Sequence, residues 1–166
     1  GNNFSNISVT GATIVTGWIN GEGSSTSAPV KTIENNTFAN WNCGSAATVL
    51  NLNNGASNTS ISFNNISNIT AADVISAIVV GNGFNGTLLT ITGNSITGLT
   101  STGGTITGIS GGSSLVTNTN VSKNEIGAFQ SAATGVTVGL TMTTTQTANY
   151  FRNKIYDISG TNAGSL

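Results

Sequence analysis

The sequence contains no histidine, a single cysteine, a single proline and very few charged residues. Its 166 residues include four basic and five acidic side chains, and the formal net charge is −1. Four cations, Lys31, Lys123, Arg152 and Lys154, are too few for the basic face that nucleic acid binding requires, so we expect no nucleic acid partner. No apolar run approaches the ~20 residues of a membrane-spanning helix, so no membrane span is expected.

Cys43 is the only cysteine, which excludes a disulfide within the chain. A reactive thiolate needs a histidine or a cation beside it, and none is evident near Cys43 in the sequence. We therefore expect a buried thiol that packs as a small apolar residue.

The rest of the composition combines β-forming apolar residues with turn-forming small residues. The hydrophobic fraction is 37%, rich in Ile, Val and Leu, and Gly, Ser, Thr and Asn dominate the remainder. That apolar fraction argues against disorder, and the mixture favours short strands separated by turns. The length suits one domain, residues 1–166. Low charge and abundant Thr and Asn suggest an extracellular or cell-surface location.

One short phrase, Asn-x-Ile/Phe-x-(Asn/Gly/Ala/Asp)-apolar, occurs six times, at intervals of 34, 28, 30, 30 and 29 residues. Its asparagines are Asn2, Asn36, Asn64, Asn94, Asn124 and Asn153. The residue two positions after each Asn is always apolar: Phe4, Phe38, Ile66, Ile96, Ile126 and Ile155. The residue five positions after it is apolar too: Ile7, Trp41, Ile69, Leu99, Phe129 and Ile158. Columns that hold their register through every copy indicate a repeat protein.

Each of the first five copies carries a second apolar segment about 10 to 17 residues after its Asn, for example ATVLNL and DVISAIVV. Alternation such as Leu89-x-Ile91 has the period of a β-strand. Short strands that recur every ~30 residues predict a chain wound in coils. The predicted fold is all-β, a right-handed parallel β-helix (solenoid) of five to six coils.

In such a fold, equivalent residues of successive coils stack about 4.8 Å apart. We expect the six asparagines to form an asparagine ladder at one corner, with buried side chains that hydrogen-bond between coils. Asn also tolerates the left-handed backbone that a corner requires. The same register places Glu125 beside Lys154 on the outer surface.

The phrases NSITGL, NEIGAF and NKIYDI resemble the repeats of right-handed parallel β-helix proteins of the pectate-lyase-like superfamily, which contain an asparagine ladder. The charge-poor variety with phrases such as NKIYDISG is similar to repeats of very long bacterial surface proteins, often exported by the type IX pathway. The resemblance extends from Asn2 to Ser159. It implies a fold and a surface location, and it implies little about activity because fold does not determine function.

Enzymes of that superfamily cleave polysaccharides with clustered carboxylates plus Lys or Arg, sometimes with calcium. The acids of this chain lie in five different copies at five different repeat positions: Glu22, Glu34, Asp73, Glu125 and Asp157. Calcium needs six to eight oxygen ligands, and no cluster supplies them. Arg152-Asn153-Lys154 resembles the Arg-x-Lys of the galacturonases, but without opposing aspartates. We expect no catalytic residues, no metal site and no cofactor.

Three functions remain open. The first is a non-catalytic structural or adhesive segment of an extracellular bacterial surface or filament protein. Because Gly1 starts inside a ladder phrase and Leu166 stops within a coil, we expect a piece of a longer repeat protein. Its partners would be further coils of the same polypeptide or neighbouring subunits end to end, with surface glycans as another partner class.

The second is a carbohydrate-binding or polysaccharide-degrading module, in which Trp18 and Trp41 could stack on sugars. Trp41 occupies an apolar column, so we expect it in the core. For Trp18 a core position is only slightly favoured over a sugar-stacking one. The third is an ice-binding solenoid, suggested by Thr90-x-Thr92 and by TMTTT at 141–145.

Overall fold

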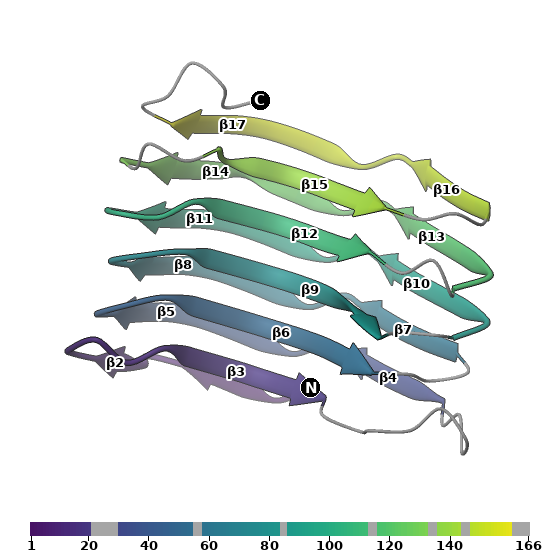
Figure 1. Cartoon of the computed structure of the whole chain (residues 1–166), viewed down its shortest axis with the longest axis horizontal. Coiled ribbons are helices and arrows are strands. Elements are labelled where there is room, and N and C mark those ends of the chain that lie inside the picture. Colours follow the sequence, from purple (N-terminus) through teal and green to yellow (C-terminus); the bar gives the residue numbers. More distant parts are fainter. Residues whose placement is uncertain are drawn as a thin grey trace.

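The computed structural model describes residues 1–20, 30–54, 58–83, 86–112, 116–132, 136–143 and 147–160. The chain winds through three parallel sheets, to which successive strands contribute in turn (Figure 1). Sheet A contains β1 (Asn3–Ser5), β2 (Ser8–Val9), β5 (Thr37–Cys43), β8 (Asn65–Ala71), β11 (Ser95–Ser101), β14 (Glu125–Ser131) and β17 (Lys154–Gly160). Sheet B contains β3 (Val15–Asn20), β6 (Ala47–Asn54), β9 (Ile75–Gly83), β12 (Ile106–Gly112) and β15 (Val138–Thr143). Sheet C contains β4 (Lys31–Glu34), β7 (Asn58–Ser62), β10 (Leu88–Thr92), β13 (Asn118–Ser122) and β16 (Thr147–Phe151).

The predicted all-β parallel solenoid is confirmed. Every recorded strand pairing is parallel and joins equivalent positions of adjacent coils, for example Ile96 with Ile126 and Leu99 with Phe129. The stack amounts to about four turns of about 30 residues, slightly fewer than the five to six coils expected. The difference arises because a five-stranded sheet spans only four coil-to-coil steps, and the end phrases were each counted as complete coils.

The interior is filled by the apolar columns identified in the sequence. Ile66, Ile96 and Ile126 have no exposed surface, and Trp41 is 2% exposed, as expected of a core residue. In sheet C, Ile61 stacks on Ile91 in the same way. Burying each such side chain contributes roughly 1.5–3 kcal/mol, which makes these columns the main source of stability.

A column of small residues in sheet B faces the large side chains of sheet A. A Cβ added at Gly17 would lie 2.6 Å from the Trp41 ring, and one added at Gly108 would lie 2.9 Å from Ile126. These glycines stand inside the second apolar segments of their coils. They provide the space into which the opposite sheet packs.

Two columns of left-handed residues bend the chain, one just before each sheet A strand and one in the middle of the long sheet A strands. The first lies one position before the ladder Asn and comprises Asn35, Phe63, Gly93, Lys123 and Arg152, with φ between 54° and 66°. The second lies four positions after it and comprises Asn6, Asn40, Asn68, Gly98, Ala128 and Asp157, with φ between 47° and 67°. The expectation that the ladder Asn itself takes this conformation is wrong, because none of the six has a positive φ.

Candidate functional site

The asparagine ladder runs through the whole stack at the corner between sheets C and A. Each amide nitrogen Nδ2 donates to Oδ1 of the Asn in the next coil, at 3.1 Å from Asn2 to Asn36, 3.0 Å from Asn64 to Asn94 and 2.9 Å from Asn124 to Asn153. The same Oδ1 also accepts the backbone N–H of the preceding Asn. Because Asn64, Asn94 and Asn124 are each only 1% exposed, these bonds form in a dry interior.

The ladder also bonds to the coil on its other side. The second Nδ2 hydrogen donates to the backbone carbonyl three residues before the previous ladder Asn: from Asn64 to Ile33, Asn94 to Ile61, Asn124 to Ile91 and Asn153 to Val121. The amides of Asn64, Asn94 and Asn124 therefore each join three successive coils. Asn36 is buried and lacks such a carbonyl among the described residues, because no described strand precedes β4 in sheet C.

A second, exposed asparagine ladder follows the other left-handed column. Asn40 Nδ2 donates to Asn6 Oδ1 at 3.2 Å, and Asn68 Nδ2 donates to Asn40 Oδ1 at 3.3 Å. The repeat phrase contains this position, which holds Asn, Gly, Ala or Asp. The preference of Asn and Gly for positive φ was the signal that could have identified it as a bend within the strand.

Glu125 and Lys154 form the outer-surface pair that the repeat register predicted. The two residues are directly opposed, and Lys154 Nζ lies 3.0 Å from Glu125 Oε1. The ammonium also lies 4.3 Å from the centre of the Tyr156 ring. The hydrogen bond from Lys154 lowers the pKa of Glu125 and, reciprocally, raises the pKa of Lys154. Both side chains are well exposed, so this is a solvated pair.

The Arg152-Asn153-Lys154 segment does not present its two cations together. Arg152 lies on the left-handed corner, Asn153 belongs to the ladder and Lys154 pairs with Glu125. Arg152 occupies the corner position that Lys123 holds in the preceding coil. The backbone N–H of Lys123 donates to the carbonyl of Phe151.

The acidic residues are placed on different parts of the solenoid. Glu34 ends β4, Asp73 lies between β8 and β9, and Glu125 and Asp157 lie on successive sheet A strands without being directly opposed. Glu22 lies outside the described residues. Within the ranges that the structure describes, no three His, Cys, Asp or Glu side chains are grouped so that they could hold a metal ion.

Cys43 is buried and unpaired, and burial raises the pKa of its thiol. It occupies a corner column of small residues, in register with Ala71, Ser101 and Ser131. In the later coils the serine hydroxyls of this column donate to backbone carbonyls, from Ser101 to Asp73 and from Ser131 to Gly104. Cys43 therefore packs as a small residue, as expected.

The hydroxyl groups of sheet C form rows rather than a flat array of exposed threonines. Thr92 Oγ1 lies 3.0 Å from Ser122 Oγ in the next coil, and Ser122 is only 5% exposed. The row that contains Thr90 continues with Ser60 and Asn120. Residues 144–145 of the TMTTT segment lie outside the described part of the chain.

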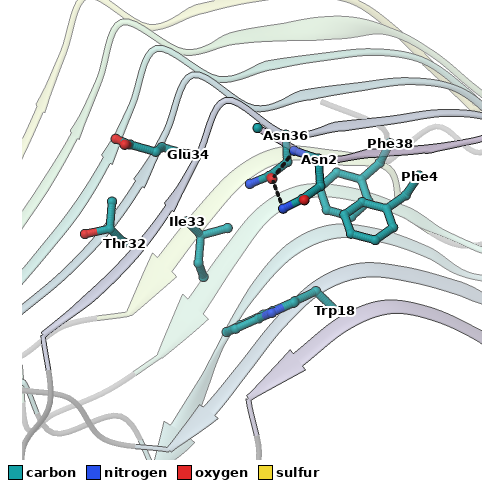
Figure 2. A pocket seen from close by; sticks show the side chains of 9 residues that line it. Asn2, Phe4, Trp18, Thr32, Ile33, Glu34, Asn36 and Phe38 are labelled. Carbon is teal, nitrogen blue, oxygen red and sulfur yellow. Dashed lines mark hydrogen bonds between the residues drawn. The ribbon is translucent and has the colours of Figure 1, made fainter.

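The N-terminal end of the stack contains a groove of about 360 Å³. Its walls are the edge strand β4, through Thr32, Ile33 and Glu34, and the start of the first coil, through Gly1 and Asn2. Figure 2 shows Ile33 pointing toward Trp18 inside the groove, while Thr32 and Glu34 lie on the other side of the strand. Phe4 stacks on Phe38 with ring centres 5.0 Å apart. Trp18 is half-buried, so it both packs on the core and lines this groove.

A second depression, of about 420 Å³, lies where the last sheet A strands end. It is lined by residues 100–102, 130–132 and 159–160, which are mostly small residues with hydroxyl groups. None of the described residues that line it is charged. It is a shallow surface feature without convergent chemistry.

The fold defines the class of the protein as a parallel β-solenoid with an asparagine ladder. No protein-family model, no curated protein sequence and no solved structure matches the chain. In the described ranges, no helix has both the length and the apolar character needed to cross a membrane.

Proposed function

We propose that the chain is a non-catalytic structural or adhesive segment of an extracellular bacterial surface or filament protein. The observation that carries the proposal is the ladder, in which the same side chain makes the same bonds in coil after coil. Such repetition supports an elongated rod whose length grows with the number of coils. The partners are further coils of the same polypeptide or neighbouring subunits end to end. Surface glycans are a further partner class.

The distribution of charge supports the same proposal. The described acids Glu34, Asp73, Glu125 and Asp157 lie on different parts of the solenoid, and the Glu125–Lys154 pair is solvent-exposed. As part of this proposal, the repeats are related to those of the pectate-lyase-like superfamily and of type IX-exported surface proteins. The proposal also includes secretion to the cell surface.

Exposed apolar side chains at the two ends of the stack indicate where the rod makes contacts. Phe4 of the first coil is 36% exposed, and Ile155 of the last sheet A strand is 49% exposed, although both belong to a column that is buried in the coils between. A patch of this kind commonly marks an interface. End-to-end association would bury it.

Sedimentation and polysaccharide cleavage, measured on one preparation, test the proposal. We expect concentration-dependent association that Phe4→Glu or Ile155→Glu reduces, while the matched control Ser95→Glu on the outer face of sheet A does not. We expect no release of reducing ends from plant or bacterial polysaccharides. A stable monomer that depolymerises a polysaccharide would overturn the proposal in favour of a carbohydrate-active module. Depression of ice growth would instead favour the ice-binding alternative.

A further inference from the structure

The first left-handed column, one position before each ladder Asn, carries side chains that its backbone conformation disfavours. Asn35 and Gly93 suit this conformation. Phe63, Lys123 and Arg152, with φ of 54°, 56° and 58°, are larger side chains that rarely adopt it. Because Asn and Gly occur throughout the chain, the strain at these three positions indicates that the side chains serve a function.

Phe63 presents an aromatic ring on the outer surface. The residue is 61% exposed, so burial does not explain its presence. A Cβ added at Gly93 would lie 2.6 Å from the Phe63 ring, which means that the ring covers Gly93 in the next coil. The position of Lys123 is one coil further, at a spacing of about 4.8 Å. The negative face of an aromatic ring attracts the C–H groups of a sugar.

Lys123 and Arg152 place two positive charges one coil apart. They directly follow Ser122 and Phe151, which are paired in register. Both cations are exposed, and within the described ranges no ion pair involves either of them. Like charges at directly opposed positions destabilise a sheet. A ligand with two negative charges would remove this repulsion.

The exposure of this corner does not depend on where the stack begins or ends. Phe63 lies between β7 and β8, and Lys123 lies between β13 and β14. Each of these four strands has a neighbour on both sides in its sheet. The column faces outward in the middle of the stack, so a further coil would extend it rather than cover it.

We propose that Phe63, Lys123 and Arg152 form a binding site for a phosphorylated sugar ring of a glycan. The two cations bind one phosphate monoester, whose charge of about −1.5 to −2 at pH 7 matches theirs. The planar guanidinium of Arg152 suits two of the phosphate oxygens. The sugar ring packs against Phe63, one coil away. The inference deepens the proposed function and rests on it only for the source of the ligand, a surface glycan.

Two other anionic partners fit this corner less well. A single carboxylate carries one charge and would leave one of the two cations unmatched. A nucleic acid also combines rings with phosphates, but its chain would bring many phosphates to a surface with only two free cations. The experiment separates these ligands.

Saturation-transfer NMR on the full chain tests the site with glucose 6-phosphate. The method observes the ligand, so association of the chain does not prevent the measurement. We expect transfer to the sugar-ring protons, displacement of glucose 6-phosphate by inorganic phosphate, and no transfer to glucose at the same concentration. No transfer to glucose 6-phosphate, or equal transfer to glucose, would overturn the proposal. Tighter binding of adenosine monophosphate would overturn it in favour of a nucleotide site.

Three variants introduce Asn, the residue that the second coil has in this column: Phe63→Asn, Lys123→Asn and Arg152→Asn. The two cation variants should bind glucose 6-phosphate at least roughly fivefold more weakly. Phe63→Asn should bind it no better than inorganic phosphate. Lys31→Gln is the matched control, because it removes the same charge from β4 and should leave binding unchanged.

The stability of the same variants separates binding from a structural role. Asn tolerates the left-handed backbone, so the urea midpoint of each Asn variant should rise while its binding falls. Lower midpoints would show that the side chains build the corner, and undiminished binding would show that they do not bind the ligand; either result contradicts the site. Polysaccharide cleavage would refute the proposed function and leave these readouts unchanged, so the two failures are distinguishable.

Discussion

Replacing Asn94 by alanine removes one rung from the middle of the asparagine ladder. Asn94 Oδ1 accepts both the backbone N–H and the Nδ2 of Asn64 at 3.0 Å. Its own Nδ2 donates to the Ile61 carbonyl at 2.9 Å and to Asn124 Oδ1 at 3.0 Å. Alanine leaves two buried donors of Asn64, its backbone N–H and one Nδ2 hydrogen, without an acceptor, while Asn124 Oδ1 keeps the backbone N–H of residue 94.

The magnitude follows from this count. Each buried donor left without a partner costs about 1–3 kcal/mol. For two such donors we expect the free energy of unfolding to fall by about 2–6 kcal/mol. Asn65→Ala is the matched control, because Asn65 is the exposed neighbour on β8, and a surface change of this kind stays within about 0.5 kcal/mol.

Urea unfolding followed by Trp41 emission measures the difference, since Trp41 is 2% exposed in the folded chain. The midpoint should fall for Asn94→Ala at an unchanged slope. Asn94→Asp adds a second criterion. A carboxylate there would face the Ile61 carbonyl and Asn124 Oδ1, so its folded pKa would rise. This variant should lose stability as pH rises above the unfolded Asp pKa of about 3.9. If Asn94→Ala is no more destabilising than Asn65→Ala, the ladder does not stabilise the fold as argued.

Three further predictions concern packing, a buried hydroxyl and the surface ion pair. Gly108→Ala should destabilise the chain by about 1–3 kcal/mol in urea unfolding, because its Cβ would lie 2.5 Å from a backbone oxygen of the next coil; an unchanged midpoint would contradict this packing. Thr119→Val should raise the unfolding free energy by about 1 kcal/mol, because the hydroxyl is buried without a hydrogen-bond partner; a loss of stability would show that the hydroxyl is bonded. The Glu125–Lys154 pair should stabilise the fold above the unfolded Glu pKa, and this contribution should disappear as pH falls through the lowered pKa of Glu125. Because the pKa of Lys154 is raised, the contribution should also be lost as pH rises through it. Lys154→Met should flatten the acid limb of the stability profile, and an unchanged profile would refute the coupling.

Much of this fold could be predicted from the sequence because a solenoid repeats one local arrangement. Six asparagines at intervals near 30 residues fix which residues stack, so the ladder and the Glu125–Lys154 register follow from counting. The facing glycines could not be found in the same way. At Gly17 and Gly108 a larger side chain would collide with side chains of sheet A such as Trp41 and Ile126. The repeat columns show which residues stack along the axis, but they do not show which residues meet across the interior.

The groove at the N-terminal end could not be predicted from the sequence either. Phe4 belongs to a column that is buried in the middle coils, so its pattern predicts core. At the N-terminal end it is 36% exposed and lines a groove together with the edge strand β4. For Trp18, the sequence left both a core position and a binding surface open.

Every coil-to-coil bond of the ladder joins residues 28 to 34 positions apart. The loop that must close to add a coil therefore has the same length however long the stack becomes, so its entropic cost does not grow. Under a force that pulls the two ends of the chain apart, the stack should release one coil at a time. Each release frees about 30 residues and breaks one rung of the ladder, and a force–extension trace should record it as a series of evenly spaced steps.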